Sequence, residues 1–480
     1  MKRSSGVLMH VSSLWGDYGC GSFGQSALKW VDFLHNGGFT YWQVLPFCLP
    51  DEFNSPYKSY STFSVNPYFI DIDALVEDEL LTPEEARSAR QASPYRCEFD
   101  ALASDRLPLL RLAAKRFCQT AANLKKMELF FADFPQTKDF CTFMALHEAN
   151  NGAPWQSWSV TDPDPDAVKA WEFMQYAAIT QWLKIKAYAN QNGVKIIGDI
   201  PMYVALDSSD VRSCPEMFRL NKKNVPSGIA GVPPDYFSAD GQVWGNPLYN
   251  WQSMKKDGYK WWKQRMAFML KLFDGVRIDH FRALESFFCI PAGESTARNG
   301  KWIKGPGMDF IKQLKSVCGD ALIIAEDLGD ITPEVRALVD KSGFPGMRVL
   351  QFGFLGDDNS DHLPHNYCKN CVAYSGTHDN NTLLGFIWEL DSPSRDRVMD
   401  YFNHDKSLWD NCYDTVLKAM LASHADTVIL PVQDLLHYGA DTRLNTPGSC
   451  KDNWAWRITE DQFFSLDAAK YKHLNSLYAR

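Results

Sequence analysis

Four acidic residues stand at or near the ends of separate apolar segments of this 480-residue chain, where a charge is costly to bury. They are Asp199, Asp279, Glu326 and Asp379. A buried carboxylate is unfavourable unless it is paired, hydrogen-bonded or used in chemistry. Any one of them alone is explained more simply by a structural ion pair. Four acids at equivalent positions on different segments favour a shared active site instead.

Asp279 and Glu326 end successive apolar segments, and two such carboxylates can cleave a bond between sugars. One attacks the anomeric carbon as an anion, while the other protonates the leaving oxygen and later deprotonates the acceptor. Retaining enzymes hold the two groups about 5–5.5 Å apart, close to the spacing of about 4.7–4.9 Å between neighbouring strands. Arg277 precedes Asp279 by two residues, so it points to the same side of a strand and could keep Asp279 ionised. A salt bridge between Arg277 and another acid is the alternative.

The elements that must position these acids are eight short apolar segments with helical patterns between most of them. The segments are residues 6–14, 41–47, 195–204, 273–281, 321–329, 347–354, 371–379 and 426–436. A helix predicted over 332–343 has Thr332 as N-cap, Pro333 at its first position and Gly343 at its end. This alternation predicts an α/β fold with a parallel sheet buried on both faces. Eight units favour a closed (β/α)₈ barrel, or TIM barrel, in which chemistry takes place at the carboxyl ends of the strands.

Two long segments interrupt this alternation. Residues 48–194 separate the second and third predicted strands and include a strongly helical stretch at 166–193, which predicts a helical insertion. Residues 205–250 are rich in Pro, Gly and aromatics, and loops of that length are usually functional or disordered. The aromatic side chains argue against disorder. We therefore expect one catalytic barrel over residues 1–480, with both insertions forming subdomains around its active-site face.

Composition excludes several classes of partner. The net charge of −9 argues against nucleic acid or an anionic membrane surface, and a neutral substrate fits it better. The N-terminal apolar run is interrupted by His10 and is too short for a signal peptide, and no segment is long enough to span a membrane. Of twelve cysteines, only Cys368 and Cys371 form a CxxC pair, and neither a second pair nor histidines at ligand spacing accompany it to make a zinc site. We expect reduced thiols in a cytoplasmic protein.

Seven motifs in order along the chain resemble one known family. They are RSSGVLMHVSSL (3–14), NSPYKSYSTFSVNPYFI (54–70), VPPDYFSADGQVWGNPLYNW (232–251), FDGVRIDHFRAL (273–284), IIAEDLGDITPEV (323–335), YSGTHDNNT (374–382) and RLNTPG (443–448). Together they closely resemble the 4-α-glucanotransferases called amylomaltases or disproportionating enzymes. The resemblance extends from about residue 3 to about residue 460.

The resemblance implies an enzyme that transfers a segment of an α-1,4-glucan to the 4-hydroxyl of an acceptor glucan or glucose. Its donors and acceptors would be α-1,4-glucans and maltooligosaccharides, and it would use no metal and no organic cofactor. Asp279 would be the nucleophile and Glu326 the general acid/base of a retaining double displacement. Asp379 would bind hydroxyls of the donor sugar and stabilise its distorted form.

Further residues match substrate-binding positions of the family: Tyr57, Asp199, Arg277, His280, His378, Asn445, Tyr236, Phe237 and Trp244. Without the resemblance, Tyr57 is more simply a packing tyrosine and His280 a structural histidine. Tyr236, Phe237 and Trp244 would cover the cleft and support the acceptor chain; the alternative is that they bury their loop against the barrel.

Two other functions remain open on the residues alone. A hydrolase of the α-amylase type would use the same carboxylates, with water in place of the acceptor sugar. A non-catalytic glucan-binding protein would leave Asp279 and Glu326 without an explanation. For the oligomeric state we expect a monomer.

Overall fold

Eight parallel strands close into a barrel, in the order in which they follow one another along the chain. The computed structural model describes residues 2–50, 53–91, 93–234, 238–449 and 451–480. The barrel strands are β1 (Ser4–Leu8), β2 (Tyr41–Gln43), β3 (Lys195–Ile200), β6 (Gly275–Ile278), β9 (Leu322–Ala325), β10 (Gly346–Val349), β11 (Cys371–Tyr374) and β12 (Thr427–Pro431). The last strand, β12, pairs in parallel with β1 and closes the ring. The predicted (β/α)₈ barrel is confirmed.

Alternate residues of the strands belong to two separate apolar cores. Ile324 of β9 and Ile429 of β12 join a cluster to which six of the barrel strands contribute, and this cluster fills the barrel interior. Their neighbours Ile323 and Val428 belong to the larger core between the strands and the helices. Both faces of each strand are therefore buried, which explains why the strands read as continuous apolar runs.

Helices surround the barrel as the sequence predicts. They include α1 (Gln25–Asn36), α11 (Lys260–Leu272), α12 (Gly307–Cys318), α13 (Pro333–Ser342), α15 (Leu383–Glu389), α16 (Ser392–Tyr401), α17 (Tyr413–Ala422), α19 (Glu460–Phe464) and α20 (Ala468–Leu477). Helix α13 begins after its N-cap Thr332 with Pro333 in the first turn. It ends at Gly343, whose φ of 69° is in the left-handed region that glycine adopts most easily.

Two of the apolar segments predicted as strands continue as α-helices. The segment 347–354 leaves the sheet after Val349 and continues as helix α14 (Leu350–Leu355). The segment 426–436 likewise ends as a strand at Pro431 and continues as helix α18 (Val432–Leu435). In both places the apolar run passes from a buried strand into a buried helix. Hydrophobic periodicity does not distinguish the two when every face is covered.

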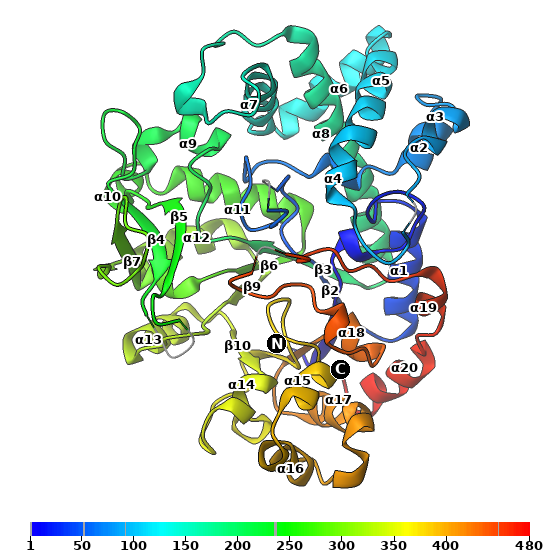
Figure 1. Ribbon diagram of the computed structural model, residues 1–480, viewed down its shortest axis with the longest axis vertical. Helices are drawn as coiled ribbons and strands as arrows, with labels where there is room; N and C mark the ends of the chain where they lie inside the picture. Colours follow the sequence, from blue (N-terminus) through cyan, green and yellow to red (C-terminus); the bar gives the residue numbers. More distant parts are fainter. Residues whose placement is uncertain (1, 51–52, 92, 235–237, 450) are drawn as a thin grey trace.

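Among the described residues between β2 and β3 there are seven α-helices, which lie mainly in the upper part of Figure 1. They are α2 (Ile72–Glu77), α3 (Pro83–Arg87), α4 (Phe99–Ala101), α5 (Leu107–Phe117), α6 (Ala121–Asp133), α7 (Thr137–Ala149) and α8 (Pro165–Gln191). Helix α8 contacts α5 and α7, and also α1 and β3 of the barrel. Its Trp182 is fully buried against the rings of Phe47 and Phe273. The same helix therefore belongs to both the barrel wall and the helical insertion.

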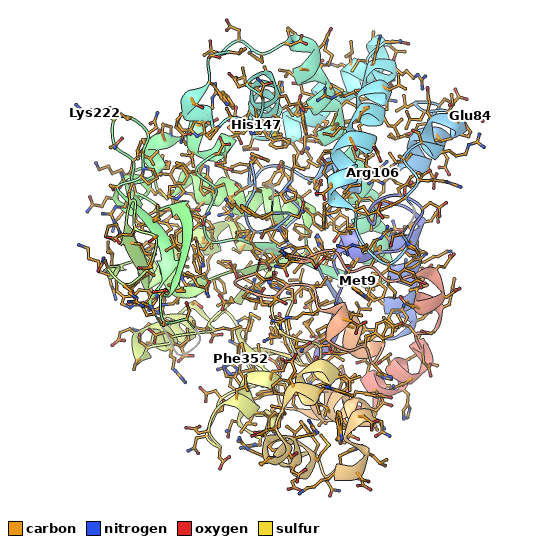
Figure 2. All side chains as sticks on the ribbon, viewed as in Figure 1. Met9, Glu84, Arg106, His147, Lys222 and Phe352 are labelled. Atoms are coloured by element: carbon orange, nitrogen blue, oxygen red, sulfur yellow. The ribbon has the colours of Figure 1, made fainter. Side chains whose placement is uncertain are left out.

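The buried Arg106, labelled in Figure 2, connects the helical insertion to the 3-10 helix Pro67–Phe69 and to Tyr18. It ends a π-helical segment, Leu102–Arg106, and its guanidinium donates a hydrogen bond to the backbone oxygen of Tyr68. Its guanidinium carbon also lies 5.8 Å from the centre of the Tyr18 ring. The cation is thus held by a carbonyl and an aromatic face.

A second, antiparallel sheet flanks the barrel on the left of Figure 1, in the order β5-β4-β7-β8. Its strands are β4 (Gly228–Val232), β5 (Gln242–Pro247), β7 (Ser286–Pro291) and β8 (Lys301–Lys304), with the short helices α9 (Ser209–Ser213) and α10 (Trp251–Lys256) nearby in the chain. Half of this sheet comes from 205–250, which the sequence analysis describes as a loop region. The other half follows β6 and is not predicted; it packs on a small core of its own.

Within the described part of the chain, no helix combines the length and the apolar character needed to cross a lipid bilayer.

Gly198 of β3 allows the barrel wall to close beside the acid that follows it. A Cβ at this position would clash with the ring of Phe273. We expect Gly198→Ala to lower the free energy of unfolding by about 1–3 kcal/mol, because the core must shift to accept the methyl group. Urea unfolding followed by tryptophan fluorescence measures this. Gly439→Ala is the matched control, since its Cβ would approach only the side-chain oxygen of Asp441. Equal stability of the two variants would contradict the prediction.

Candidate active site

Arg277 lies between two carboxylates and binds both of them. Its Nη1 is 2.7 Å from Oδ2 of Asp199, and its Nη2 is 2.8 Å from Oδ1 of Asp279. Asp199 on β3 and Arg277 on β6 are paired in the parallel register. Ile197, two residues before Asp199, lies in the barrel-interior cluster, so Asp199 and its partner Arg277 also face the interior. Asp279 follows β6 directly, and its side chain is 30% exposed.

The charges of this group are strongly coupled. Burial would lower the pKa of Arg277, but Asp199 and Asp279 together hold that pKa well above its ordinary value. Burial raises the pKa of Asp199 to about 6, although Arg277 acts in the opposite direction. One cation therefore serves two carboxylates, of which Asp199 is buried and Asp279 opens to solvent.

Glu326 lies beside Asp279 in a different electrostatic environment. Glu326 follows β9 directly. Ala325, which precedes Glu326, and Ile278, which precedes Asp279, are register partners on the adjacent strands β9 and β6. Its Oε2 accepts the backbone N–H of His280 at 2.5 Å, and its Oε1 accepts that of Leu328 at 2.9 Å. Burial nevertheless raises the pKa of Glu326 to about 8; Arg277 opposes this shift and the charge of Asp279 adds to it. Two neighbouring carboxyl groups with such different surroundings can divide the roles of acid and nucleophile.

His280 forms the turn that directs its backbone N–H toward Glu326. Its φ is 47°, in the left-handed region that costs energy for a residue with a side chain. Burial lowers the pKa of His280 to about 4, so the ring is neutral at physiological pH. Among the described residues, His280 Nε2 and Asp199 Oδ1 are buried polar atoms without a hydrogen-bond partner. Such atoms next to a reactive group are suited to bind a ligand's hydroxyl groups.

Asp379 lies in the loop after β11 and is held by three neighbours. Its Oδ2 is 3.3 Å from Nε2 of His378, and its Oδ1 accepts a 2.6 Å hydrogen bond from Nδ2 of Asn445. Arg443 donates to its backbone oxygen at 2.6 Å. Desolvation acts to raise the pKa of Asp379, but His378 and Asn445 hold it below its ordinary value. Asp379 is therefore an anion at physiological pH.

Tyr57 connects the Asp379 loop to the Arg277 group. Its hydroxyl donates to Oδ2 of Asp199 at 2.8 Å. Its ring is stacked on that of His378, with centroids 5.0 Å apart and an interplanar angle of 17°. Trp454 packs against both rings at 5.9 Å. Tyr57 thus makes specific polar and stacking contacts within the site.

Two buried side chains that the sequence analysis does not single out brace the loop of Asp379. Asp434 on α18 accepts the hydroxyl of Ser375 at 2.5 Å and the backbone N–H of Leu383 at 2.8 Å, so it holds both ends of the loop. Gln351 on α14 donates to the backbone oxygen of Asn381 at 2.7 Å. An acid within an apolar run is the signal that could have identified Asp434, as it identified Asp199.

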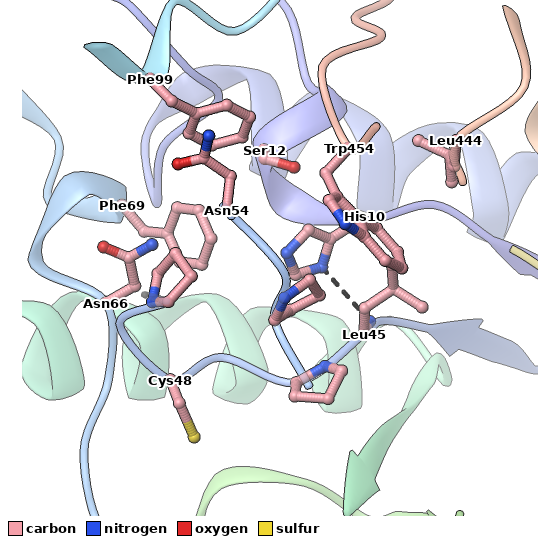
Figure 3. A pocket seen from close by; sticks show the side chains of 13 residues that line it. His10, Ser12, Leu45, Cys48, Asn54, Asn66, Phe69, Phe99, Leu444 and Trp454 are labelled. Carbon is pink, nitrogen blue, oxygen red and sulfur yellow. Dashed lines mark hydrogen bonds between the residues drawn. The ribbon is translucent and has the colours of Figure 1, made fainter. Parts of the chain in front are cut away.

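A small pocket lies next to this site, between the loops after β1 and β2 and the segment 444–454 (Figure 3). His10 lines it, and its Nδ1 accepts the backbone N–H of Leu45 at 3.2 Å. Burial lowers the pKa of His10 to about 3, so this histidine is neutral. Trp454, whose φ is 65°, borders the pocket and reaches the Tyr57 ring. Trp454 therefore connects the pocket to Tyr57 of the site.

The aromatic residues predicted to line the acceptor side are described only in part. Trp244 lies on β5 and is partly buried, with its ring nearly perpendicular to that of His280 at a centroid distance of 4.9 Å. Tyr236 and Phe237 lie outside the described residues. Trp244 therefore connects the flanking sheet to the turn that carries the Glu326 hydrogen bond.

Comparison with known proteins identifies the family. The family model described as 4-alpha-glucanotransferase matches residues 9–462. The chain is 42% identical to the 4-alpha-glucanotransferase of Streptococcus pneumoniae serotype 4, over 100% of this chain and 98% of that protein. It is 40% identical to the 4-alpha-glucanotransferase of Clostridium butyricum, over 98% of this chain and 100% of that protein. The structure is similar to that of the amylomaltase from Streptococcus agalactiae in complex with acarbose, with a TM-score of 0.95 and 35% sequence identity over 100% of each chain. The chain therefore belongs to the 4-alpha-glucanotransferase family.

Proposed function

We propose that Asp279 and Glu326 carry out the family's transfer reaction by a retaining double displacement. A segment of an α-1,4-glucan passes from its donor to Asp279 and then to the 4-hydroxyl of an acceptor glucan or glucose. The observation that carries this proposal is the contrast between two neighbouring carboxyl groups. Asp279 is paired with a cation, whereas burial keeps Glu326 protonated.

In the first step Glu326 donates its proton to the leaving glycosidic oxygen while Asp279 attacks the anomeric carbon. This breaks the glucosidic bond and forms a covalent glycosyl-enzyme. In the second step Glu326, now a carboxylate, removes the proton from the acceptor hydroxyl, which attacks the same carbon and releases Asp279. The spacing of about 4.8 Å between adjacent strands such as β6 and β9 suits the separation of about 5–5.5 Å between the two carboxyl groups of retaining enzymes.

The donor sugar is held by polar groups on both sides of Asp279. Asp379, oriented by His378 and Asn445, accepts hydrogen bonds from sugar hydroxyls and favours the distorted ring of the transition state. The unpartnered Oδ1 of Asp199 and Nε2 of His280 bind further hydroxyls, which supply the partners that these buried atoms need. The proposal thus accounts for otherwise costly buried polar atoms.

Transfer prevails over hydrolysis when an acceptor sugar occupies the site in place of water. We propose Trp244, with Tyr236 and Phe237 of the same segment, as the surface on which the acceptor rests. The contact of Trp244 with His280 supports this, since it brings an indole next to the reacting groups. A bound acceptor gains an entropic advantage over diffusing water.

We further propose that residues 1–480 act as one catalytic unit with insertions at about 48–194 and 205–250. The shared helix α8 and the joint sheet of β4, β5, β7 and β8 support treating these parts as one body. A cytoplasmic monomer that binds neither nucleic acid nor membranes is in keeping with the net charge of −9.

Maltotriose alone distinguishes transfer from hydrolysis. We expect glucose and a ladder of longer maltooligosaccharides, separated by chromatography, because glucan rather than water accepts the glycosyl group. Asp279→Asn should abolish the ladder, as the amide is a poor nucleophile. Asp358→Asn, at an aspartate whose side chain is 93% exposed, is the matched control and should retain it. Glucose and maltose without longer products would indicate a hydrolase, and turnover by Asp279→Asn would refute the assigned nucleophile.

The pH dependence tests the role of Glu326. Because the reaction needs its protonated form, kcat/KM should fall as pH rises through its raised pKa, about 8. Glu326→Gln should lose most activity on maltotriose but still release 4-nitrophenol from a 4-nitrophenyl maltoside, whose leaving group needs no proton. An alkaline limb that persists in Glu326→Gln with this second substrate would assign the titration to another group.

Asp434 tests whether the loop of Asp379 must be braced. Asp434→Ala leaves the buried N–H of Leu383 without its acceptor, and we expect kcat/KM to fall about tenfold or more. Asp434→Asn keeps an acceptor oxygen and should restore most of the activity. A positioning role predicts that kcat falls at a temperature well below the melting temperature of the variant, where unfolding does not explain the loss. Wild-type kcat in Asp434→Ala would exclude that role.

A further inference from the structure

An aromatic surface patch lies at the end of α15, outside the site described above. Trp388 is 66% exposed, and Leu408 of the neighbouring segment Lys406–Asn411 is 48% exposed. The ring of Trp409 meets that of Trp388 at a centroid distance of 5.2 Å and an angle of 66°. We call Trp388, Leu408 and Trp409 the Trp388 platform. An exposed indole gives up the stabilisation that burial would provide, so such a patch marks a binding surface.

The exposed indole stands on a rigid base. Arg395 of α16 donates from Nη2 to the backbone oxygen of Trp388 at 3.1 Å and from Nε to that of Ile387 at 3.1 Å. The same guanidinium lies over the Trp409 ring, 4.3 Å from its centre. Arg395 thus caps the carboxyl end of α15 and supports the second ring, so the platform is held in its exposed position.

Helix α15 leads from the donor-binding loop to the platform. It begins after Thr382, three residues beyond Asp379, and its seven residues span roughly 10 Å. Arg443, which binds the backbone oxygen of Asp379, is also within electrostatic range of Glu389, the residue after Trp388. Helix α15 further packs against the segment Ala440–Thr442 that precedes Arg443. Helix α15 and the segment before Arg443 therefore connect the platform to the loop of Asp379.

We infer that the Trp388 platform is a second binding site for α-1,4-glucan, which holds a part of a long chain that extends out of the active site. The inference rests on the proposed location of the donor site at Asp379. A glucose ring offers an apolar C–H face to an indole, and the exposed carboxylate of Glu389, next to Trp388 in the chain, can accept hydrogen bonds from sugar hydroxyls. On this inference, a long chain contacts the platform and a short oligosaccharide at the catalytic residues does not.

Binding is tested in the Asp279→Asn background, which removes turnover. We expect the Kd for amylose, measured by affinity electrophoresis, to rise about fivefold when Trp388→Ala is added, whereas the Kd for maltotriose stays unchanged. Trp388→Phe keeps a ring and should bind amylose nearly as well. The matched control is Phe464→Ala on α19, because Phe464 is 65% exposed but lies on another element. Persistent product formation by Asp279→Asn would show that the proposed mechanism fails, whereas an unchanged amylose Kd in the Trp388→Ala variant would show that the platform inference fails, so the two failures are distinguishable.

In the otherwise wild-type enzyme, Trp388→Ala should raise KM for amylose about fivefold and leave kcat and KM for maltotriose unchanged. Two results would overturn the inference. One is equal amylose affinity with and without Trp388. The other is a dimer in light scattering that Trp388→Ala dissociates, which would assign the platform to contact with a second copy of the chain.

Discussion

The shared cation of Arg277 is the interaction on which the site depends. Without this cation, the carboxylates of Asp199 and Asp279 would repel each other, and the loss of hydration at the buried Asp199 would not be compensated. Arg277 reaches both because it lies opposite Asp199 in the sheet register and two residues before Asp279 on its own strand. The barrel thus supplies the geometry, and the ion pairs keep the acids in place. Removing the cation would leave buried negative charge uncompensated, a larger loss than that of one hydrogen bond.

The remaining parts of the site are organised around this group from several elements. Tyr57, in the long connection after β2, donates a hydrogen bond to Asp199, and its ring stacks on that of His378 in the loop after β11. Asp434 and Gln351 hold that loop from α18 and α14, each following its own strand. Most of the groups therefore project from the carboxyl ends of different barrel strands. This arrangement explains how residues far apart in the chain converge on one sugar-sized space.

Much of this arrangement could be predicted from the sequence, and the omissions have physical reasons. The eight strands stand out because both faces are buried, and the acids Asp199, Asp279 and Glu326 stand out because they interrupt those runs. The helices α14 and α18 were predicted as strand continuations, since an apolar run has no readable period when fully covered. Strands β7 and β8 join their sheet through the pairing of β7 with β4, a segment distant in the chain, so only the folded structure reveals that sheet. The hydrogen bonds of Tyr57 and Asp434 join residues distant in the chain, and only the folded structure brings these together.

His280 links the two central carboxyl groups through the main chain. It follows Asp279 directly, and its backbone N–H binds Glu326, so a single peptide group sets the relative placement of both acids. Every amino acid except proline offers that N–H, so the hydrogen bond itself does not involve the imidazole, although the φ of 47° restricts which residues can occupy the position. Substrate preference can therefore diverge during evolution through side chains around the cleft, while the stereochemical course of the reaction stays with a backbone feature that point mutations seldom remove.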